Sequence, residues 1–298
     1  MNKLPLQKRV MILNMLVEGM SMRSISRTVD VSINTVTKLL VDAGEACAAY
    51  HDETVRDIHA RRVQCDEIWS FCYAKDKNVA TAKAAPDGAG DVWTWTALDS
   101  DSKMILAWEV GDRSTQTALE FMTNLRDRLA NRVQLTTDGL RAYLDAVDGA
   151  FGTDVDYAQL VKLYGDDGSR GPEKKYSPSI CKGTRKRTVT GSPDRAEIST
   201  SHVERQNLSM RMGMRRFTRL TNAFSKKLAN HLHMLSIYFV HYNFCRQHKS
   251  LGGISPAMAA QVTDTLHDME WIVSLIDART PMPNRPAVYK KRASTISN

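Results

Sequence analysis

"RRVQCDEIWSFCYA", residues 61–74, is rich in the β-branched and aromatic residues that favour strands. Within it Asp66 lies among the apolar residues Val63, Cys65 and Ile68. An ionised carboxylate in a central strand is costly unless a cation or hydrogen-bond donors satisfy it. Asp66 is therefore either close to a strand end on a solvated face or a ligand of a cation. Side chains alternate along a strand, so we expect Glu67 on the other face and only one of the two acids in a shared site.

The sequence on the carboxyl side of this stretch alternates between strand and helix patterns. Two further strands are followed in turn by a helix, a strand, a short helix and a fifth strand, predicted at 91–100, 103–112, 115–130, 132–139, 140–147 and 154–165. Three meandering strands followed by alternating helices and strands predict an α/β domain with a mixed sheet. Residues 165–200 contain Gly, Pro, Ser and the run "KGTRKR", so we expect a basic insertion without regular structure.

Two more acids could join Asp66 in a metal site. Asp138 ends the predicted strand 132–139, and carboxylates at strand ends of α/β sheets lie where clefts open. The alternative for Asp138 is an ordinary turn-forming Asp-Gly. Glu204 lies in a predicted helix that begins near residue 201. Three carboxylates from two strands and a helix could hold two hard divalent cations about 3.5–4 Å apart, which suits in-line attack on a phosphodiester.

Glu204 is the one acid of residues 201–250, which contain nine Lys or Arg. It is either a surface residue in a helical ion pair or a metal ligand in a region that attracts a polyanion. Thr200 and Leu208 occupy the i−4 and i+4 positions, so a helical salt bridge at that spacing is not available. This favours the metal site.

The N-terminal residues have the pattern of three short helices. Ser21 and Ser32 are placed to cap the second and third, and Gly44 is a plausible end for the third. A short helix, a tight turn and a longer helix are typical of a helix-turn-helix, which would present Asn34, Thr35, Thr37 and Lys38 to duplex DNA. The alternative is a plain three-helix bundle.

Composition limits the class of protein. A formal charge of +8 and a pI near 9.2 suit a polyanion partner. No apolar run approaches the ~20 residues that a membrane span requires, so no membrane is expected. Five scattered cysteines without a C-x-x-C pair predict neither a disulfide framework nor a zinc finger, and they suit a reduced cytoplasm.

Three segments, "CDEIWSF" (65–71), "TTDGLRAY" (136–143) and "STSHVERQNLSMRMGMRRFTRLTNAFSKK" (199–227), resemble the DDE transposases of bacterial insertion sequences, and most closely the insertion-sequence-one type. The resemblance spans residues 60–262 and continues back through the N-terminal helices. It implies a ribonuclease H-like catalytic domain preceded by an all-α helix-turn-helix domain. Unlike some relatives, the chain has no cysteine before Cys47 that could build an N-terminal zinc module.

Carried over position by position, the resemblance places the catalytic and metal-binding triad on Asp66, Asp138 and Glu204. It implies two Mg²⁺ ions, for which Mn²⁺ can substitute, and double-stranded DNA as the partner. It places a phosphate-binding cation at Arg211, seven residues after Glu204 on the same helix face. The basic residues of this region are the expected DNA contacts: Arg205, Arg211, Arg215, Arg216, Arg219, Lys226 and Lys227.

These observations predict a transposase that binds the terminal repeats of its element, cleaves each end and transfers the strand to target DNA. Two ends must be joined in concert, so we expect at least a dimer, in the bacterial cytoplasm and on the nucleoid when bound to DNA. The alternatives are a DNA-binding regulator on a transposase scaffold and a structure-selective nuclease that joins no strands. The expected parts are a helix-turn-helix domain, a helical connector, the catalytic domain, and a C-terminal helix with a basic tail, at 1–44, 45–61, 62–262 and 263–298.

Overall fold

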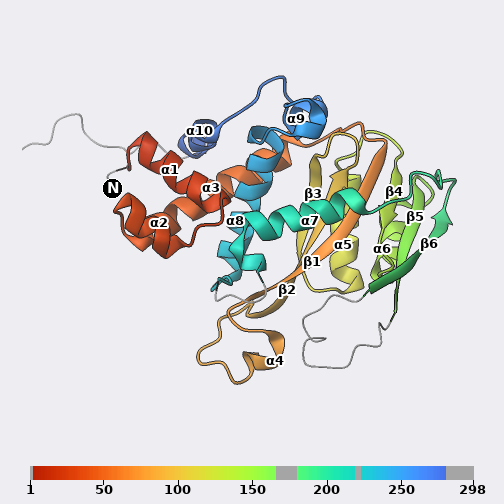
Figure 1. Cartoon of the computed structure of the whole chain (residues 1–298), viewed down its shortest axis with the longest axis horizontal. Coiled ribbons are helices and arrows are strands. Elements are labelled where there is room, and N and C mark those ends of the chain that lie inside the picture. Colours follow the sequence, from red (N-terminus) through yellow and green to blue (C-terminus); the bar gives the residue numbers. More distant parts are fainter. Residues whose placement is uncertain (1–2, 166–179, 219–222, 280–298) are drawn as a thin grey trace, which may run out of the picture.

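Six strands form one mixed sheet in the computed structural model, which describes residues 3–165, 180–218 and 223–279 (Figure 1). Their spatial order is β3-β2-β1-β4-β5-β6. β4 and β5 run parallel to β1, whereas β2, β3 and β6 are antiparallel to their neighbours. This confirms the predicted mixed α/β fold. The strand bounds are β1 Arg62–Cys72, β2 Gly90–Asp99, β3 Ile105–Gly111, β4 Gln134–Thr137, β5 Asp156–Gly165 and β6 Ile180–Thr190.

β6 corrects the prediction of an irregular insertion at 165–200. It pairs antiparallel with β5 along most of its length and contains the basic run "KGTRKR". Lysine and arginine are common on edge strands, where they discourage pairing with a further chain, and they conceal the apolar alternation that identifies inner strands. Residues 191–200 form no helix or strand, as predicted, and residues 166–179 lie outside the described residues.

The register between β1 and β4 brings two acids side by side. Cys65 pairs with Thr137 in the parallel ladder, so the following residues of the two strands, Asp66 and Asp138, are neighbours. On the other side of β1, Asp66 pairs with Thr96 of β2. A carboxylate just beyond the last paired position of two adjacent parallel strands lies where the sheet opens, as the sequence predicted for Asp138.

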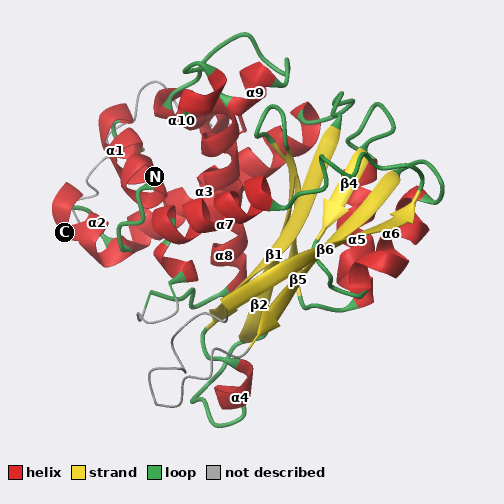
Figure 2. Cartoon of the chain, turned by 45° about the vertical axis from the view of Figure 1, so that its right-hand side comes forward, coloured by secondary structure: helices red, strands yellow, loops and turns green. Residues whose placement is uncertain are grey.

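Helices cover both faces of this sheet (Figure 2). α5 (Thr115–Arg126) and α6 (Ala142–Phe151) lie on one face, where Phe121 and Tyr143 pack against Trp95 of β2. α7 (Ser201–Gly213) crosses the other face over β1 and β2. α5 begins at the Ser114 cap, whose Oγ accepts the Thr117 N–H, and buries four of the residues expected from its helical spacing: Ala118, Phe121, Met122 and Leu125. It ends at Arg126, so the predicted end at residue 130 is four residues too late and Leu129 lies beyond the helix.

The N-terminal residues form α1 (Leu6–Val17), α2 (Met22–Val29) and α3 (Ile33–Thr54), with Ser21 and Ser32 as the caps of the last two, as predicted. Gly44 does not end the third helix, which continues for another ten residues to Thr54. A Cβ at Gly44 would lie 2.3 Å from the Cβ of His233, so this glycine permits a close crossing of α3 and α8 (Leu228–Val240). A glycine at a helix crossing looks the same in sequence as a glycine at a helix end.

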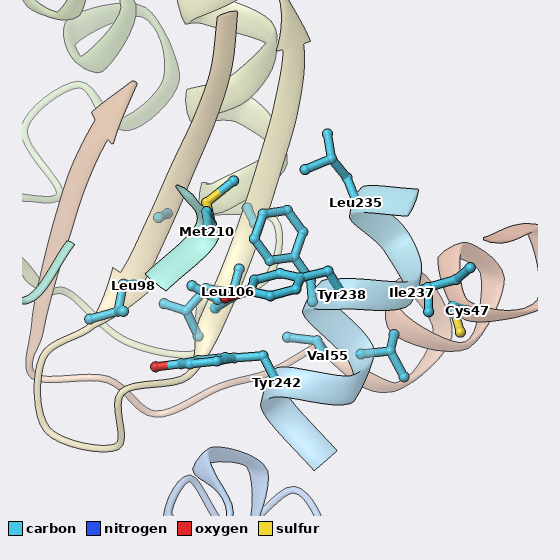
Figure 3. Close-up of a cluster of buried hydrophobic side chains, with 14 of the residues drawn as sticks. Cys47, Val55, Leu98, Leu106, Met210, Leu235, Ile237, Tyr238 and Tyr242 are labelled. Atoms are coloured by element: carbon cyan, nitrogen blue, oxygen red, sulfur yellow. The ribbon is translucent and has the colours of Figure 1, made fainter. Parts of the chain in front are cut away.

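The helical part and the sheet share one apolar core. Figure 3 shows α8 in that core, with Ile237 toward Cys47 of α3 and Tyr238 toward Met210 of α7. α10 (Met269–Arg279) packs on α1 and α3, and the guanidinium of Arg9 in α1 makes two hydrogen bonds, of 2.6 and 3.1 Å, to the carboxylate of Asp277. α1 to α3 are therefore fixed to the rest of the chain.

The remaining regular elements are short. They are the helices α4 (Asp76–Val79) and α9 (Pro256–Ala259), the 3₁₀ turns Arg215–Phe217 and Lys249–Leu251, and the π-helical turn His241–Cys245. Among the described residues, no helix has the length and the hydropathy needed to cross a bilayer.

Candidate functional site

β1 sends its two adjacent acids to opposite faces of the sheet. Glu67 is buried on the face under α5 and α6, where its carboxylate accepts hydrogen bonds from the Arg113 guanidinium (2.5 Å) and from the Tyr143 hydroxyl (3.1 Å). The Arg113 guanidinium also stacks on the ring of Trp93, 4.4 Å from its centroid. Glu67 therefore has a cation and a second donor within the protein.

Asp66 lies on the face under α7 and has a different environment. One of its oxygens accepts a hydrogen bond of 2.8 Å from the side-chain amide of Asn207. No lysine or arginine forms an ion pair with Asp66 among the described residues; Arg113 is paired with Glu67 and Lys162 with Glu204. A backbone hydrogen bond from Glu67 adds to it, so the donors that reach this half-buried carboxylate are neutral.

Asp138 follows β4 directly and caps the next turn, where its Oδ1 accepts the Leu140 N–H at 2.8 Å. Asp66, Glu67 and Asp138 each offer one carboxylate oxygen within 4.8 Å of the other two. The sequence-based expectation that only one acid of β1 could approach a shared site is therefore wrong in distance, although the alternation of faces is confirmed. At the open end of a strand pair, side chains from both faces can reach around the edge toward the same point.

Glu204 is placed by the attachment of α7 to β1. The side-chain oxygen of Gln64, two residues before Asp66, accepts the N–H groups of His202 (2.8 Å) and Val203 (3.1 Å) at the start of the helix. These hydrogen bonds satisfy N–H groups that have no partner within the helix. They fix the first turn of α7, with Glu204 in it, on the same face of the sheet as Asp66.

The Glu204 carboxylate has a partner that the helical spacing could not show. Lys162 of β5 forms an ion pair with it at 2.6 Å, and the Thr200 hydroxyl donates a hydrogen bond of 2.5 Å. Lys162 lies on β5, which is the second strand from β1 in the sheet. The side chains of Lys162 and Glu204 are each about one-third exposed. The sequence context suggested that the cations near Glu204 contact other groups. The structure shows that one cation, Lys162, pairs with Glu204 itself.

The acids on this face influence one another. Burial and, after it, the charges of Glu67, Asp138 and, more weakly, Glu204 together raise the pKa of Asp66 to about 8. Burial also raises the pKa of Asp138; Arg113 and Lys162 partly oppose this rise, and Glu204 adds to it. Glu204 is thus close enough to Asp66 and Asp138 for its charge to be felt by both. A cation bound between these acids would offset the repulsion among their negative charges.

The donor set suits a hard divalent cation. Its members are carboxylate oxygens, which Mg²⁺ and Mn²⁺ prefer. Asn207, one helical turn beyond Glu204, adds a second observation: its amide N–H₂ holds Asp66, while its Oδ1 is buried without a hydrogen-bond partner. An orphaned oxygen beside a carboxylate with a raised pKa is what a cation or a cation-bound water would satisfy. The residues present therefore fit a divalent metal.

The basic residues predicted to contact DNA have different environments. Arg205, Arg211 and Arg215 are exposed on or just after α7, and the ammonium of Lys226 lies 3.8 Å from the ring centroid of Phe224. Arg216 is instead held within the protein, where it donates to the Ser225 hydroxyl (3.0 Å) and the Asn230 carbonyl (2.9 Å).

Burial lowers the pKa of Arg216 to about 10. Its two hydrogen bonds hold the segment between α7 and α8 in place, so we do not expect Arg216 to contact DNA. Lys227 is exposed at the N-cap of α8 and stays a candidate DNA contact, and Arg219 lies outside the described residues.

On α3, Asn34 and Lys38 are exposed, whereas Thr35 and Thr37 are half-buried. The Thr37 hydroxyl donates to the Ile33 carbonyl at 2.9 Å, and Lys38 forms an ion pair with Asp42 at 2.6 Å, four residues further along the helix. Asn34 and Lys38 are thus the residues of this helix best placed to meet a ligand.

Sequence reasoning missed Asn207, Lys162 and Arg113. Asn207 had a usable signal, because it follows Glu204 by three residues and so shares its face of a helix. The other two are brought to the acids by the order of the strands and by the loop before α5, and no spacing along the chain indicates either contact.

No family model matches the chain, and no curated protein matches it. Similar solved structures are complexes of the Mos1 transposase. A paired-end complex with the left transposon end has 17% identity over 50% of this chain and 58% of that one, with a TM-score of 0.21. A mariner paired-end complex with Mn has 16% identity over the same shares, with a TM-score of 0.20. A pre-cleavage transpososome has 13% identity over 53% and 60%, again with a TM-score of 0.20. The chain thus spans about three-fifths of their length, and at these scores the similarity assigns no function.

Proposed function

We propose that the protein is a metal-dependent DNA transposase of the DDE type, in which Asp66, Asp138 and Glu204 hold two divalent cations, Mg²⁺ in the cell. One observation carries the proposal. Asp66 and Asp138 lie side by side on parallel strands, and α7 brings Glu204 and Asn207 to the same face, where the pKa of Asp66 is raised and no lysine or arginine of the described residues pairs with it.

The choice of these three acids over the cluster of Asp66, Glu67 and Asp138 follows from the partners of Glu67. Its carboxylate already has the Arg113 guanidinium and the Tyr143 hydroxyl. A metal at Glu67 would have to displace a cation that is fixed by stacking on Trp93. Glu204 has one pair to exchange, with Lys162, and this pair is partly exposed and therefore weak.

The reaction we propose has two steps. Hydrolysis of a phosphodiester at each element end leaves a 3′ hydroxyl and a 5′ phosphate. That hydroxyl then attacks a phosphodiester of the target strand, forming a new bond and releasing the 3′ hydroxyl of the target. Metal ions held by the three acids would supply Lewis-acid stabilisation of the entering and leaving oxygens.

The chain's own residues have separate parts in this scheme. Asn207 orients Asp66, Gln64 fixes the helix that holds Glu204, and Lys162 neutralises Glu204 until a metal binds. Arg205, Arg211 and Arg215 contact the DNA backbone, and residues 1–44, through Asn34 and Lys38, bind the terminal repeats. The catalytic domain is of the ribonuclease H-like kind, the element is of the bacterial insertion-sequence-one type, and the active complex is at least a dimer because two ends are joined.

The test is a strand-transfer assay with labelled duplexes taken from the DNA that borders the gene. Cleavage and joining that require Mg²⁺ or Mn²⁺ are the expected result, and Ca²⁺ should support binding with little chemistry because it prefers longer bonds and more ligands. Cleavage without joining would identify a nuclease, and binding without either would identify a regulator. Full activity in EDTA would refute the metal site.

A further inference from the structure

A cavity lies on the opposite face of α7 from the acids. It has a volume of about 390 Å³, and α7 contributes His202, Arg205, Gln206 and Ser209 to its wall. These positions follow the i, i+3, i+4, i+7 spacing of one helix face, whereas Glu204 and Asn207 lie on the other. One helix therefore separates the candidate metal site from this cavity.

Three cations from three different elements line the cavity. Lys103 comes from the β2–β3 turn, Arg205 from α7, and Arg246 from the segment after α8. Among the described residues, no carboxylate forms an ion pair with any of the three. The acid of the cavity wall, Asp101, is paired with Arg61 and Arg62. The charges of Asp101 and Asp99 act on Lys103, and the cavity wall carries three cations against one acid, which leaves it net positive.

Lys103 is held in place at the turn. Its backbone has a φ of +64°, a left-handed conformation that is uncommon for a residue with a side chain. Its ammonium donates to the Ser100 carbonyl and lies 3.2 Å from Nε2 of His202. The turn therefore presents a fixed charge to the cavity.

His248 supplies a buried polar atom without a partner. It lines the cavity, its ring stands edge-on to that of the buried Tyr242 at 4.8 Å, and its Nε2 is buried without a hydrogen-bond partner. Burial, reinforced by Arg246 and Lys103, lowers its pKa to about 4, so the ring is neutral at physiological pH. A buried ring nitrogen without a partner beside three unpaired cations indicates a polar ligand.

We propose that this cavity binds one phosphate group of a DNA strand, between Lys103, Arg205 and Arg246, with His248 as an additional hydrogen-bonding partner. The proposal rests on the proposed function, because that function supplies DNA as the ligand. The apolar wall of Leu98 and Leu251 and a volume near the lower end of the range for ligand sites leave room for the attached sugar. Contacts to phosphate fix the position of a strand without reading its sequence. A phosphate held here would anchor the DNA on α7, the helix that positions Glu204.

The test compares two variants that each remove one positive charge from the same segment. Arg246 lines the cavity, and Lys249, three residues later, is exposed and does not. In the full chain with EDTA present, Arg246→Gln is expected to weaken binding of a short duplex by about tenfold, as the loss of a charge-assisted hydrogen bond would. Lys249→Gln is expected to weaken it by about twofold at most. Equal losses in the two variants would overturn the proposal.

A spectroscopic readout follows the cavity itself. Titration of inorganic phosphate should shift the ring ¹⁵N resonances of His248 in the unsubstituted protein and in Lys249→Gln, and much less in Arg246→Gln. Unchanged His248 resonances with both phosphate and duplex DNA bound would refute the site. Shifts with phosphate but none with DNA would also refute it, because the ligand would then be a free anion.

These outcomes are separable from those of the proposed function. Binding is measured without metal, and strand cleavage is measured with it. Preferential loss of binding in Arg246→Gln, in a protein that never cleaves DNA, would keep the phosphate site and reject the transposase. Metal-dependent cleavage with no difference between the two variants would do the reverse.

Discussion

The two faces of the sheet each receive one carboxylate from β1, and they satisfy it in different ways. Under α5 and α6, Glu67 is hydrogen-bonded to Arg113 and Tyr143. Under α7, Asp66 accepts a hydrogen bond from Asn207, and burial together with the nearest acids raises its pKa. These residues are adjacent in the chain, and burial and the charge of Asp138 raise the pKa of both, but a cation, Arg113, opposes the rise at Glu67 alone.

This difference distinguishes a structural acid from a candidate ligand. Closeness of oxygens alone includes both residues, since Asp66, Glu67 and Asp138 approach within 4.8 Å of one another. The internal partners separate them. A buried carboxylate that the protein has already paired gains little from a metal ion, whereas one surrounded by like charges gains much.

Glu204→Gln should have the largest effect on the chemistry of the α7 face. It retains the shape of the side chain and removes a charge that would hold a metal ion, so cleavage should fall by more than about 100-fold, beyond the loss expected from a residue that only supports a ligand. The matched control is Glu197→Gln, which removes an exposed acid that forms an ion pair with Arg62. A Glu204→Gln protein that cleaves at nearly the normal rate, with Glu197→Gln inactive, would move the third ligand to Glu197.

Glu67→Gln should affect stability and leave cleavage largely in place. The buried hydroxyl of Tyr143 and the Arg113 guanidinium would lose a charged acceptor, which lowers the free energy of unfolding by about 1–3 kcal/mol. Urea unfolding monitored by circular dichroism measures the change. A protein of unaltered stability that has lost its cleavage activity would place Glu67 in the metal site instead.

Metal-free protein should lose stability as the pH rises, because of Asp66. The pKa of this carboxyl is about 8 in the folded chain, against 3.8 for an unperturbed Asp. Between these values the folded state binds more protons than the unfolded state, so the free energy of unfolding falls with increasing pH, by up to about 1.4 kcal/mol per pH unit. Asp66→Asn should remove this part of the slope, and unfolding curves in EDTA across this range measure it. An identical slope in the two proteins would contradict the raised pKa.

Lys162→Met should have the smallest effect, and this effect should be an increase in metal affinity. The ion pair with Glu204 is partly exposed, and pairs of this kind contribute about 0.2–1 kcal/mol. Its removal frees Glu204 for a metal, so Mn²⁺ should bind up to about fivefold more tightly in calorimetry. Arg185→Met, on the exposed part of β6, is the control for the loss of one charge. Weaker Mn²⁺ binding in Lys162→Met alone would mean that Lys162 supports the metal site and does not compete with it.

The sequence predicted those features that depend on local pattern. The strand with Asp66, the position of Asp138 after β4, the caps Ser21 and Ser32, and the buried stripe of α5 all follow from spacing and residue type. The features that it missed depend on neighbours in space. Gly44 permits the crossing of two helices, and Lys162 reaches Glu204 across the sheet. Arg216 lies in a basic stretch typical of DNA contacts, but its hydrogen-bond partners lie within the protein.

Mn²⁺ affinity in Asp66→Asn and Glu67→Gln, measured side by side by calorimetry near pH 8, tests the difference between the two faces most directly. The two variants neutralise acids at adjacent positions of β1, so any general electrostatic effect is shared. We predict a loss of more than about 100-fold for Asp66→Asn and a small change, within about threefold, for Glu67→Gln. Equal losses, or a larger loss for Glu67→Gln, would contradict the assignment of the metal to the face under α7.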